Sequence, residues 1–181
     1  MNRIRKLFSE KKKNIVSIYF TAGFPQLNDT NTILNALQKH GADIVEIGMP
    51  YSDPLADGPV IQLSSMKALD NGMSIKMLFE QLNKFRSNPT SGVRGFPLLL
   101  MGYLNPVLQY GMEEFCSDAF DLGIDGIILP DLPLHEYETE YKKFFEKYNL
   151  EFIFLITPET NKKRIRKIDA FSKGFIYAVS S

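Results

Sequence analysis

Short apolar runs alternate with segments of helical periodicity along this chain, and no other feature restricts the fold as strongly. In the run Ile44–Ile47, apolar residues point to both sides, as in a parallel strand that is covered on both faces. We expect strands at Asn14–Ala22, Ile44–Ile47, Phe96–Tyr103, Asp125–Asp131, Glu151–Thr157 and Gly174–Ser181. We expect a short helix around Ile4–Phe8, a helix capped by Asn28 or Asp29, further helices at Val60–Asn71, Ser74–Arg86, Glu113–Leu122, Tyr137–Tyr148 and Lys162–Ser172, and a loop at Asn88–Gly95.

Strands that alternate with helices imply a parallel sheet, either a doubly wound open sheet or a (β/α)8 TIM barrel. No G-x-G-x-x-G follows the first strand, which argues against a dinucleotide-binding sheet. Polar residues stand at the ends of several of the expected strands. In a barrel these ends form a ring, whereas an open sheet offers a single crevice, so the pattern favours the barrel. The tripeptides Gly41–Asp43 and Gly123–Asp125 each precede a strand, as in a repeated βα unit. We therefore expect an α/β chain with the TIM barrel fold.

Residues 1–181 are expected to form one barrel domain, because 44% hydrophobic and 23% charged residues are an ordinary globular composition. A complete barrel has eight strands and at least about 200 residues. Six strands are expected here, so we expect a barrel truncated after strand six, without the last two βα units. Barrels of this kind hold phosphate after strands seven and eight. The chain as given is therefore expected to be inactive alone.

Charge and cysteine content exclude several classes of function. Lys plus Arg and Asp plus Glu balance at 21 each, so no overall field attracts nucleic acid or an anionic membrane. The basic segment Arg3–Lys13 has no apolar core behind its charges and is not a secretory signal. The one cysteine, Cys116, excludes an intramolecular disulfide and suits a cytoplasmic protein, with a buried inert thiol as its expected state. His40 and His135 are expected at the surface, and no metal site is expected.

Glu46 interrupts the second apolar run, and a proline-rich acidic loop follows it. An ionised, unpaired carboxylate inside a sheet costs several kcal/mol. Glu46 is therefore either paired with a neighbouring cation, neutralised by a raised pKa, or retained for chemistry. The prolines of the loop Pro50–Pro59 stiffen a segment that carries Asp57. Since barrels place their chemistry at the carboxyl ends of strands, Glu46 and Asp57 are expected to face one pocket and to divide acid and base roles.

Four motifs of the chain resemble the tryptophan synthase alpha chain family. The most specific is EIGMPYSDPLADGP at Glu46–Pro59, and the others are IYFTAGFP at Ile18–Pro25, LLMGYLNP at Leu99–Pro106 and GIILPDLP at Gly126–Pro133. The resemblance covers about residue 4 to the last residue. It implies a lyase of tryptophan biosynthesis that splits indole-3-glycerol phosphate into indole and glyceraldehyde 3-phosphate by a retro-aldol step.

The resemblance also implies roles for individual residues. Glu46 matches the family's acid/base at the indole carbon and the side-chain hydroxyl. Asp57 matches the carboxylate that holds the indole N–H and stabilises positive charge on the ring. Tyr103 and Tyr177 match family positions that line the indole pocket, and Asp131 matches a family acid in the loop near the pocket and the partner interface. Tyr19 lies in a similar place on the first strand, and all four are expected to bind the substrate.

Structural explanations compete with these roles when the residues are taken without the resemblance. Asp57 stands where it could cap a helix beginning at Val60. A tyrosine in a parallel strand is often part of the core, and Asp131, between Pro130 and Pro133, could be a turn residue. These alternatives remain open at the level of the sequence.

The resemblance implies a partner and a division of cofactors. It implies no organic cofactor on this chain, pyridoxal phosphate on a tryptophan synthase beta chain, and an α2β2 heterotetramer. The loop Tyr51–Gly58 is expected to face that partner. The alternative is a non-catalytic docking or regulatory barrel, which would be free to lose Glu46 and Asp57. Another phosphosugar barrel fits the fold but not the motif SDPLADGP, and it would usually need metal ligands or a Schiff-base lysine.

Overall fold

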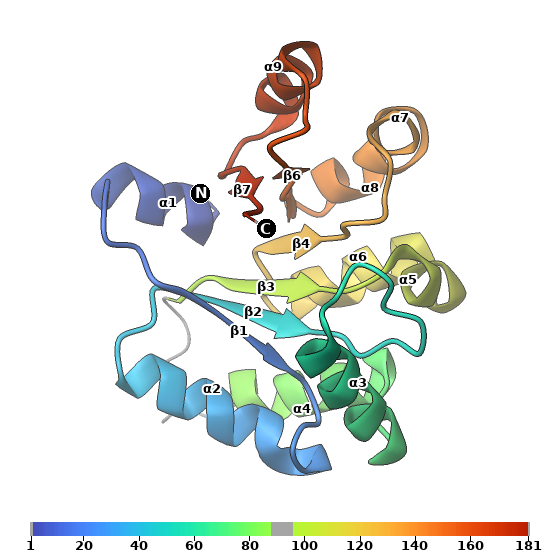
Figure 1. Cartoon of the computed structure of the whole chain (residues 1–181). Coiled ribbons are helices and arrows are strands. Elements are labelled where there is room, and N and C mark those ends of the chain that lie inside the picture. The colour runs from blue at the N-terminus through green and yellow to red at the C-terminus, as the bar shows by residue number, and fades with distance from the viewer. Residues whose placement is uncertain (1, 88–95, 181) are drawn as a thin grey trace.

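The computed structural model describes residues 2–87 and 96–180, and within them a parallel sheet forms the centre of the molecule (Figure 1). Five strands pair in the order β1-β2-β3-β4-β5, and β6 pairs with β7 in a second, two-stranded sheet. The strands are β1 Ser17–Thr21, β2 Ile44–Gly48, β3 Leu98–Met101, β4 Gly126–Ile128, β5 Glu151–Phe152, β6 Leu155–Ile156 and β7 Tyr177–Ala178. The expected loop Asn88–Gly95 lies outside the described residues.

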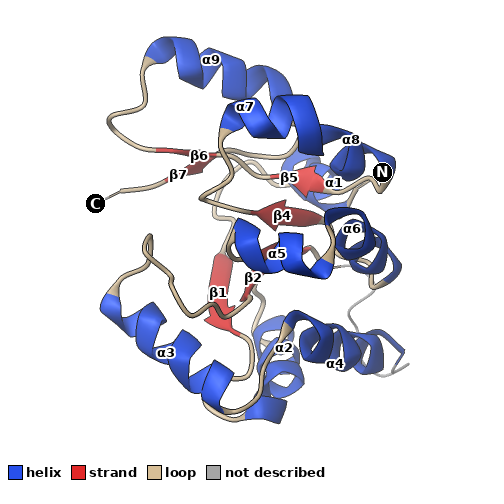
Figure 2. Ribbon diagram, turned by 90° about the vertical axis from the view of Figure 1, so that its right-hand side faces the viewer, coloured by secondary structure: helices blue, strands red, loops and turns tan. Residues whose placement is uncertain are grey.

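Helices follow the strands and lie mainly around the outside of them (Figure 2). They are α1 Arg3–Glu10, η1 Leu27–Asp29, α2 Thr30–Lys39, α3 Pro59–Asp70, α4 Ile75–Ser87, α5 Leu104–Tyr110, α6 Met112–Asp121, α7 Leu134–Glu136, η3 Tyr137–Tyr141, α8 Lys142–Lys147 and α9 Lys162–Phe171. Each predicted helix is confirmed within a few residues, although the one at Tyr137–Tyr148 begins with the π-helical turn η3. The expected side-chain cap of α2 is wrong, because Asp29 stands at the N-cap position but its carboxylate accepts the N–H of Gln26 instead. The sequence did not predict α5, whose Pro106 lies in the first turn, where a proline removes no helical hydrogen bond.

Side chains of the strands alternate between two apolar clusters. Ile44 packs with Leu99, Ile128 and Ile153 in a small interior cluster, which Ile4 of α1 closes from one end. The neighbours of these residues along the strands pack instead in the larger cluster that includes the helices. Because successive residues of a strand point to opposite faces, Glu46 lies on the same side of β2 as Ile44. The carboxylate therefore faces the interior of the curved sheet.

The strand expected at Glu151–Thr157 is divided between two sheets. Its first part pairs with β4, where the N–H of Ile153 donates to the carbonyl of Ile127 at 2.9 Å. Its second part pairs with β7, where the N–H of Tyr177 donates to the carbonyl of Phe154 at 2.8 Å. One segment thus passes from one neighbour to the next with an offset, as strands do in a sheet that curls with a stagger. The expected single six-stranded sheet is corrected on this point.

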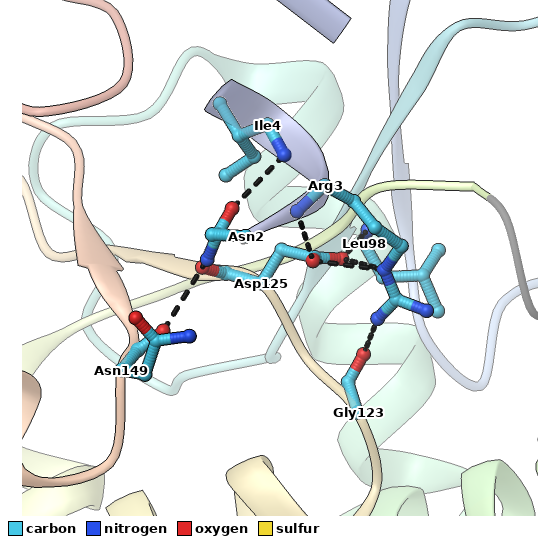
Figure 3. Close-up of polar contacts among 7 residues, drawn as sticks. All are labelled: Asn2, Arg3, Ile4, Leu98, Gly123, Asp125 and Asn149. Carbon is cyan, nitrogen blue, oxygen red and sulfur yellow. Dashed lines mark hydrogen bonds and ion pairs between the residues drawn. The ribbon is translucent and has the colours of Figure 1, made fainter. Parts of the chain in front are cut away.

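The N-terminal helix is attached to the starts of the strands by charged groups. Arg3 Nε lies 2.8 Å from an oxygen of Asp125, and its guanidinium also donates to the carbonyl of Gly123 (Figure 3). Asn2 caps α1 by accepting the N–H of Ile4 at 2.9 Å, and its amide donates to the carbonyl of Asp125. Two further ion pairs, Arg5–Glu151 and Lys11–Asp43, join this segment to the starts of β5 and β2.

The repeated tripeptides of the sequence have the same role in both places. Asp43 accepts the backbone N–H of Val16 at 2.8 Å, and Asp125 accepts that of Leu98 at 3.0 Å. Each carboxylate therefore joins the start of its own strand to the start of the preceding strand and also pairs with a basic side chain of the N-terminal segment. The repeat is a device that aligns neighbouring strands at the end of the sheet opposite the candidate site.

Candidate active site

Glu46 is a buried carboxylate in the middle of β2, with only 2% of its surface exposed. Its Oε1 accepts a hydrogen bond of 2.5 Å from the hydroxyl of Ser17 on β1. Burial raises the pKa of Glu46, and the bond from Ser17 offsets part of that rise. Among the described residues, no cation pairs with Glu46. The alternative that a neighbouring cation pairs with Glu46 is therefore wrong for the described residues. The structure favours the alternative of a raised pKa.

The loop after β2 turns sharply and leads into α3. The N–H of Leu55 donates to the carbonyl of Asp53, and the N–H of Asp57 donates to that of Pro54 at 3.0 Å. The residue that caps α3 is Gly58, whose extended backbone precedes Pro59 at the first helical position. The expected alternative that Asp57 caps this helix is therefore wrong. The carboxylate of Asp57 is left for other contacts.

Asp57 and Tyr103 meet at one side of a small cavity. The phenol Oη of Tyr103 donates to Oδ2 of Asp57 at 3.0 Å and accepts the N–H of Ala56, also at 3.0 Å. Burial raises the pKa of Asp57, and the bond from Tyr103 lowers it in part. Burial is also the main cause that raises the pKa of Tyr103 to about 12, so its hydroxyl stays protonated at neutral pH.

The cavity is lined mainly by aromatic and apolar side chains from the carboxyl ends of β1 to β4. Its lining residues are Tyr19, Met49, Tyr51, Asp57, Ser65, Met101, Gly102, Tyr103 and Pro130. The three tyrosine rings and the carboxylate of Asp57 give this wall flat ring faces beside one acceptor for an N–H or O–H donor.

Tyr19 lies close enough to both carboxylates of the site for their charges to act on its phenol. It lies opposite Glu46 in the pairing of β1 with β2, and the negative charges of Glu46 and Asp57 add to the burial that raises the pKa of its phenol. Its hydroxyl lies against Gly48, where a Cβ atom would be 2.1 Å away. Gly48 is therefore required by the close approach of Tyr19 to the backbone of β2.

Tyr177 and Asp131 occupy different surroundings from the cavity wall. Tyr177 is half-buried on β7, and the charge of Glu46 adds to the burial that raises its pKa. Both carboxylate oxygens of Asp131 accept the backbone N–H of Leu104 at 3.0 Å, at the start of α5. Of the six candidate residues, Tyr19, Asp57 and Tyr103 line the cavity. Glu46 lies opposite Tyr19 on β2, Tyr177 packs against the interior cluster, and Asp131 fixes a neighbouring corner.

Sequence reasoning missed several residues that support the site. Ser17 precedes Tyr19 by two positions, so the period of a strand is a signal that both face Glu46. The hydroxyls of Thr21 and Ser64 lie 2.7 Å apart and connect β1 to α3, and no local pattern predicts that contact.

Other candidate groups lie away from this site. Cys116 is buried, with a pKa raised to about 12 mainly by burial, as expected of an inert thiol. His40 and His135 are exposed, as predicted. In residues 2–87 and 96–180, no group of three or more His, Cys, Asp or Glu residues is placed to hold a metal ion. Nor does any helix in those ranges have the length and apolar character needed to cross a membrane.

Comparisons with known proteins agree on one family. The family model described as tryptophan synthase alpha chain matches residues 4–181. The tryptophan synthase alpha chain of Flavobacterium johnsoniae is 56% identical over 181 residues, which are 100% of this chain and 69% of that protein. The structure of tryptophan synthase subunit alpha from Legionella pneumophila is 37% identical, with a TM-score of 0.90, 99% of this chain covered and 68% of that one. A tryptophan synthase structure from M. tuberculosis, in an aminoacrylate-bound form, is 31% identical over 99% of this chain and 72% of that one, with a TM-score of 0.88.

Proposed function

Because the chain belongs to the tryptophan synthase alpha chain family, we propose that it carries the carbon–carbon lyase chemistry of that family. The reaction is the retro-aldol cleavage of indole-3-glycerol phosphate to indole and glyceraldehyde 3-phosphate. The observation that carries the proposal is the pair of carboxylates Glu46 and Asp57. Neither pairs with a cation among the described residues, burial raises the pKa of both, and both act on the phenol of Tyr19 beside one aromatic cavity.

Glu46 is proposed as the general acid and base. In its protonated form it gives a proton to the indole carbon that bears the side chain, which places positive charge on the ring nitrogen. The carboxylate then takes the proton of the neighbouring side-chain hydroxyl. As that O–H bond breaks, a carbonyl forms, the carbon–carbon bond breaks, and its electron pair returns to the ring as indole. A pKa above the usual range suits a group that must both give and take a proton near neutral pH.

Asp57 is proposed to hold the N–H of the indole and to stabilise the positive charge of the protonated ring. Tyr19 and Tyr103 form the wall along which the ring lies. Tyr177, half-buried and close enough to Glu46 to feel its charge, is proposed as a further wall of the same pocket. Asp131 contributes indirectly, because its carboxylate is occupied by the start of α5.

We propose a tryptophan synthase beta chain as the partner in an α2β2 complex, with pyridoxal phosphate on that chain and no organic cofactor on this one. The M. tuberculosis relative is named as a whole tryptophan synthase, which supports this assignment. The loop Tyr51–Gly58 is the proposed contact, because it connects Asp57 to the surface and exposes 91% of Leu55. The unpaired Cys116 is in keeping with the cytoplasm as the proposed compartment.

The test measures the release of indole from indole-3-glycerol phosphate by the alpha chain in complex with its beta chain. Glu46→Gln is expected to lower kcat by about 10² to 10⁴, because the amide cannot transfer protons. Asp57→Asn is expected to retain more activity, since its role is electrostatic. Asp121→Asn, an exposed acid on α6 outside both the cavity and the proposed contact loop, is the matched control and should behave like the wild type.

Unchanged turnover in Glu46→Gln would overturn the proposed role. A chain that releases no indole but still raises the activity of the beta chain would favour the alternative, a docking or regulatory barrel.

A further inference from the structure

The hydroxyl of Tyr103 both donates and accepts a hydrogen bond, and both partners lie in the loop after β2. It donates to Oδ2 of Asp57 and accepts the N–H of Ala56, each at 3.0 Å. Only 8% of Tyr103 is exposed, so this hydroxyl has little access to water. Since Oδ1 of Asp57 accepts no hydrogen bond from the residues that the structure describes, that second oxygen is the one left for a ligand in the cavity.

We propose that Tyr103 is a positioning residue for Asp57: its hydroxyl fixes one carboxylate oxygen and the adjacent backbone, so that the other oxygen faces the cavity in its ionised form. This inference rests on the proposed function of Asp57 and adds to the wall-forming role of Tyr103. It concerns the phenol hydroxyl rather than the ring.

The corner that carries Tyr103 is itself held in place from two sides. Asp131, after β4, accepts the N–H of Leu104 with both carboxylate oxygens. From the other side, the ring of Tyr51 lies 5.3 Å from that of Tyr103, and its hydroxyl accepts the amide of Asn105 at 3.3 Å. The loop after β2 is thus attached to a corner that is fixed by β4. This arrangement explains why Asp131, an acid of the family motif, points at a backbone N–H instead of the cavity.

The bond from Tyr103 opposes the effect of burial on Asp57. Burial favours the protonated carboxyl, whereas a hydrogen bond donated to the carboxylate favours the ionised form. The other titratable groups around this point are Tyr19 on β1, Glu46 on β2, Tyr51 in the same loop and Asp131 after β4. All of them are phenols or acids, and an ionised acid nearby makes a second negative charge less favourable. Tyr103 is therefore the group that favours the ionised form of Asp57 against the effect of burial.

The test is Tyr103→Phe, which keeps the ring and its contact with the ring of Tyr51. Without the hydroxyl, the pKa of Asp57 rises further, so the acidic limb of the profile of kcat/KM against pH moves to higher pH. Because a hydrogen bond to a charged group contributes appreciably to stabilisation, its loss should lower kcat/KM at pH 6 by about 10-fold. The fall should be smaller at pH 8.5, because a higher pH favours the ionised form of Asp57 in both proteins.

Tyr110→Phe is the matched control, because Tyr110 also donates to a carboxylate, that of Asp118, at 2.5 Å and outside the cavity. It should leave the profile unchanged. The double variant Tyr103→Phe with Asp57→Asn should show no larger loss at pH 6 than Asp57→Asn alone. The proposal would be overturned if the losses of Tyr103→Phe and Asp57→Asn were equal and added up in the double variant. A loss of kcat/KM in Tyr103→Phe that did not depend on pH would also overturn it.

A second measurement separates this inference from the proposed reaction. Amide hydrogen exchange of Ala56 and Asp57 should become faster in Tyr103→Phe and remain unchanged in Tyr110→Phe, whatever reaction the protein performs. If Glu46→Gln kept full activity while this exchange changed as expected, the proposed function would fail and the positioning role would stand. Unchanged exchange in Tyr103→Phe would reject the positioning role.

Discussion

Glu46 shows how a single buried acid is accommodated without a cation. The hydroxyl of Ser17 satisfies one oxygen, and the remaining cost of burial appears as a raised pKa. The sequence predicted that Glu46 is buried, since a carboxylate among Ile44, Val45 and Ile47 has no other place to lie. It did not predict Ser17 as the partner, because the contact depends on how β1 aligns with β2.

This pKa leads to a prediction about stability. A raised pKa means that the folded protein binds the proton of Glu46 more tightly than the unfolded chain does. Its contribution to the free energy of unfolding is therefore fully present below the ordinary pKa of a glutamic acid and is lost as the pH rises through the raised value. Glu46→Gln removes that loss, so the variant should be more stable than the wild type at pH 8 and nearly equal to it at pH 4.

Urea unfolding of both proteins at the two pH values measures this difference. Asp53→Asn, in the exposed part of the loop, should show no such change between pH 4 and pH 8. If Glu46→Gln were equally or less stable than the wild type at pH 8, the carboxylate would have a stabilising partner that offsets its burial.

Elements of this chain were predictable where local patterns determine them. The helices at Val60–Asn71 and Ser74–Arg86 follow from helical periodicity, and the structure has them within one residue at most ends. Tertiary contacts determine the rest. The division of Glu151–Thr157 between two neighbours depends on the stagger of the sheet, and α5 begins at a corner that Asp131 stabilises from 27 residues away.

The two copies of the repeated tripeptide differ in burial, and this difference leads to a second prediction. Asp125 is buried and receives the backbone N–H groups of Arg3 and Leu98 as well as the Arg3 side chain. Asp125→Asn should cost about 2–4 kcal/mol of the free energy of unfolding, because buried donors lose their acceptor. Asp43 is more exposed, and Asp43→Asn should cost within about 1 kcal/mol.

The control for the tripeptide prediction is the pH dependence of the same measurement. The pKa of Asp43 is lowered, mainly by the bond from Lys11. Its contribution is therefore present above the ordinary pKa of an aspartic acid and is lost as the pH falls through the lowered value. The small difference between Asp43→Asn and the wild type should vanish at low pH. If Asp43→Asn and Asp125→Asn lowered the free energy of unfolding equally at pH 7, burial would not be what distinguishes the two aspartates.

At the scale of the whole molecule, the attachment of the loop after β2 to the corner after β3 organises the candidate site. The hydrogen bond between Asp57 and Tyr103 joins residues 46 positions apart. The sequence could place both near the carboxyl ends of neighbouring strands, because a barrel brings those ends together. The hydrogen bond itself could not be predicted from the sequence, because it depends on the turn at Pro54–Asp57 and on the direction of α5.

Two features of the whole surface lead to the last prediction, which concerns the polypeptide of residues 1–181. Among residues 2–87 and 96–180, β1 and β7 are edge strands, and the helix α3 presents Val60, Leu63 and Met66 with 75%, 66% and 55% of their surfaces exposed. Unpaired strand edges and exposed apolar side chains favour association with a second copy. We expect this polypeptide to self-associate as its concentration rises, as sedimentation velocity will measure.

The double variant Leu63→Glu with Met66→Glu should shift association to higher concentration, whereas Phe120→Glu, at a 51% exposed position on α6, should shift it much less. A polypeptide that stays monomeric across the same range, or an equal shift in both variants, would mean that α3 and the strand edges do not drive association.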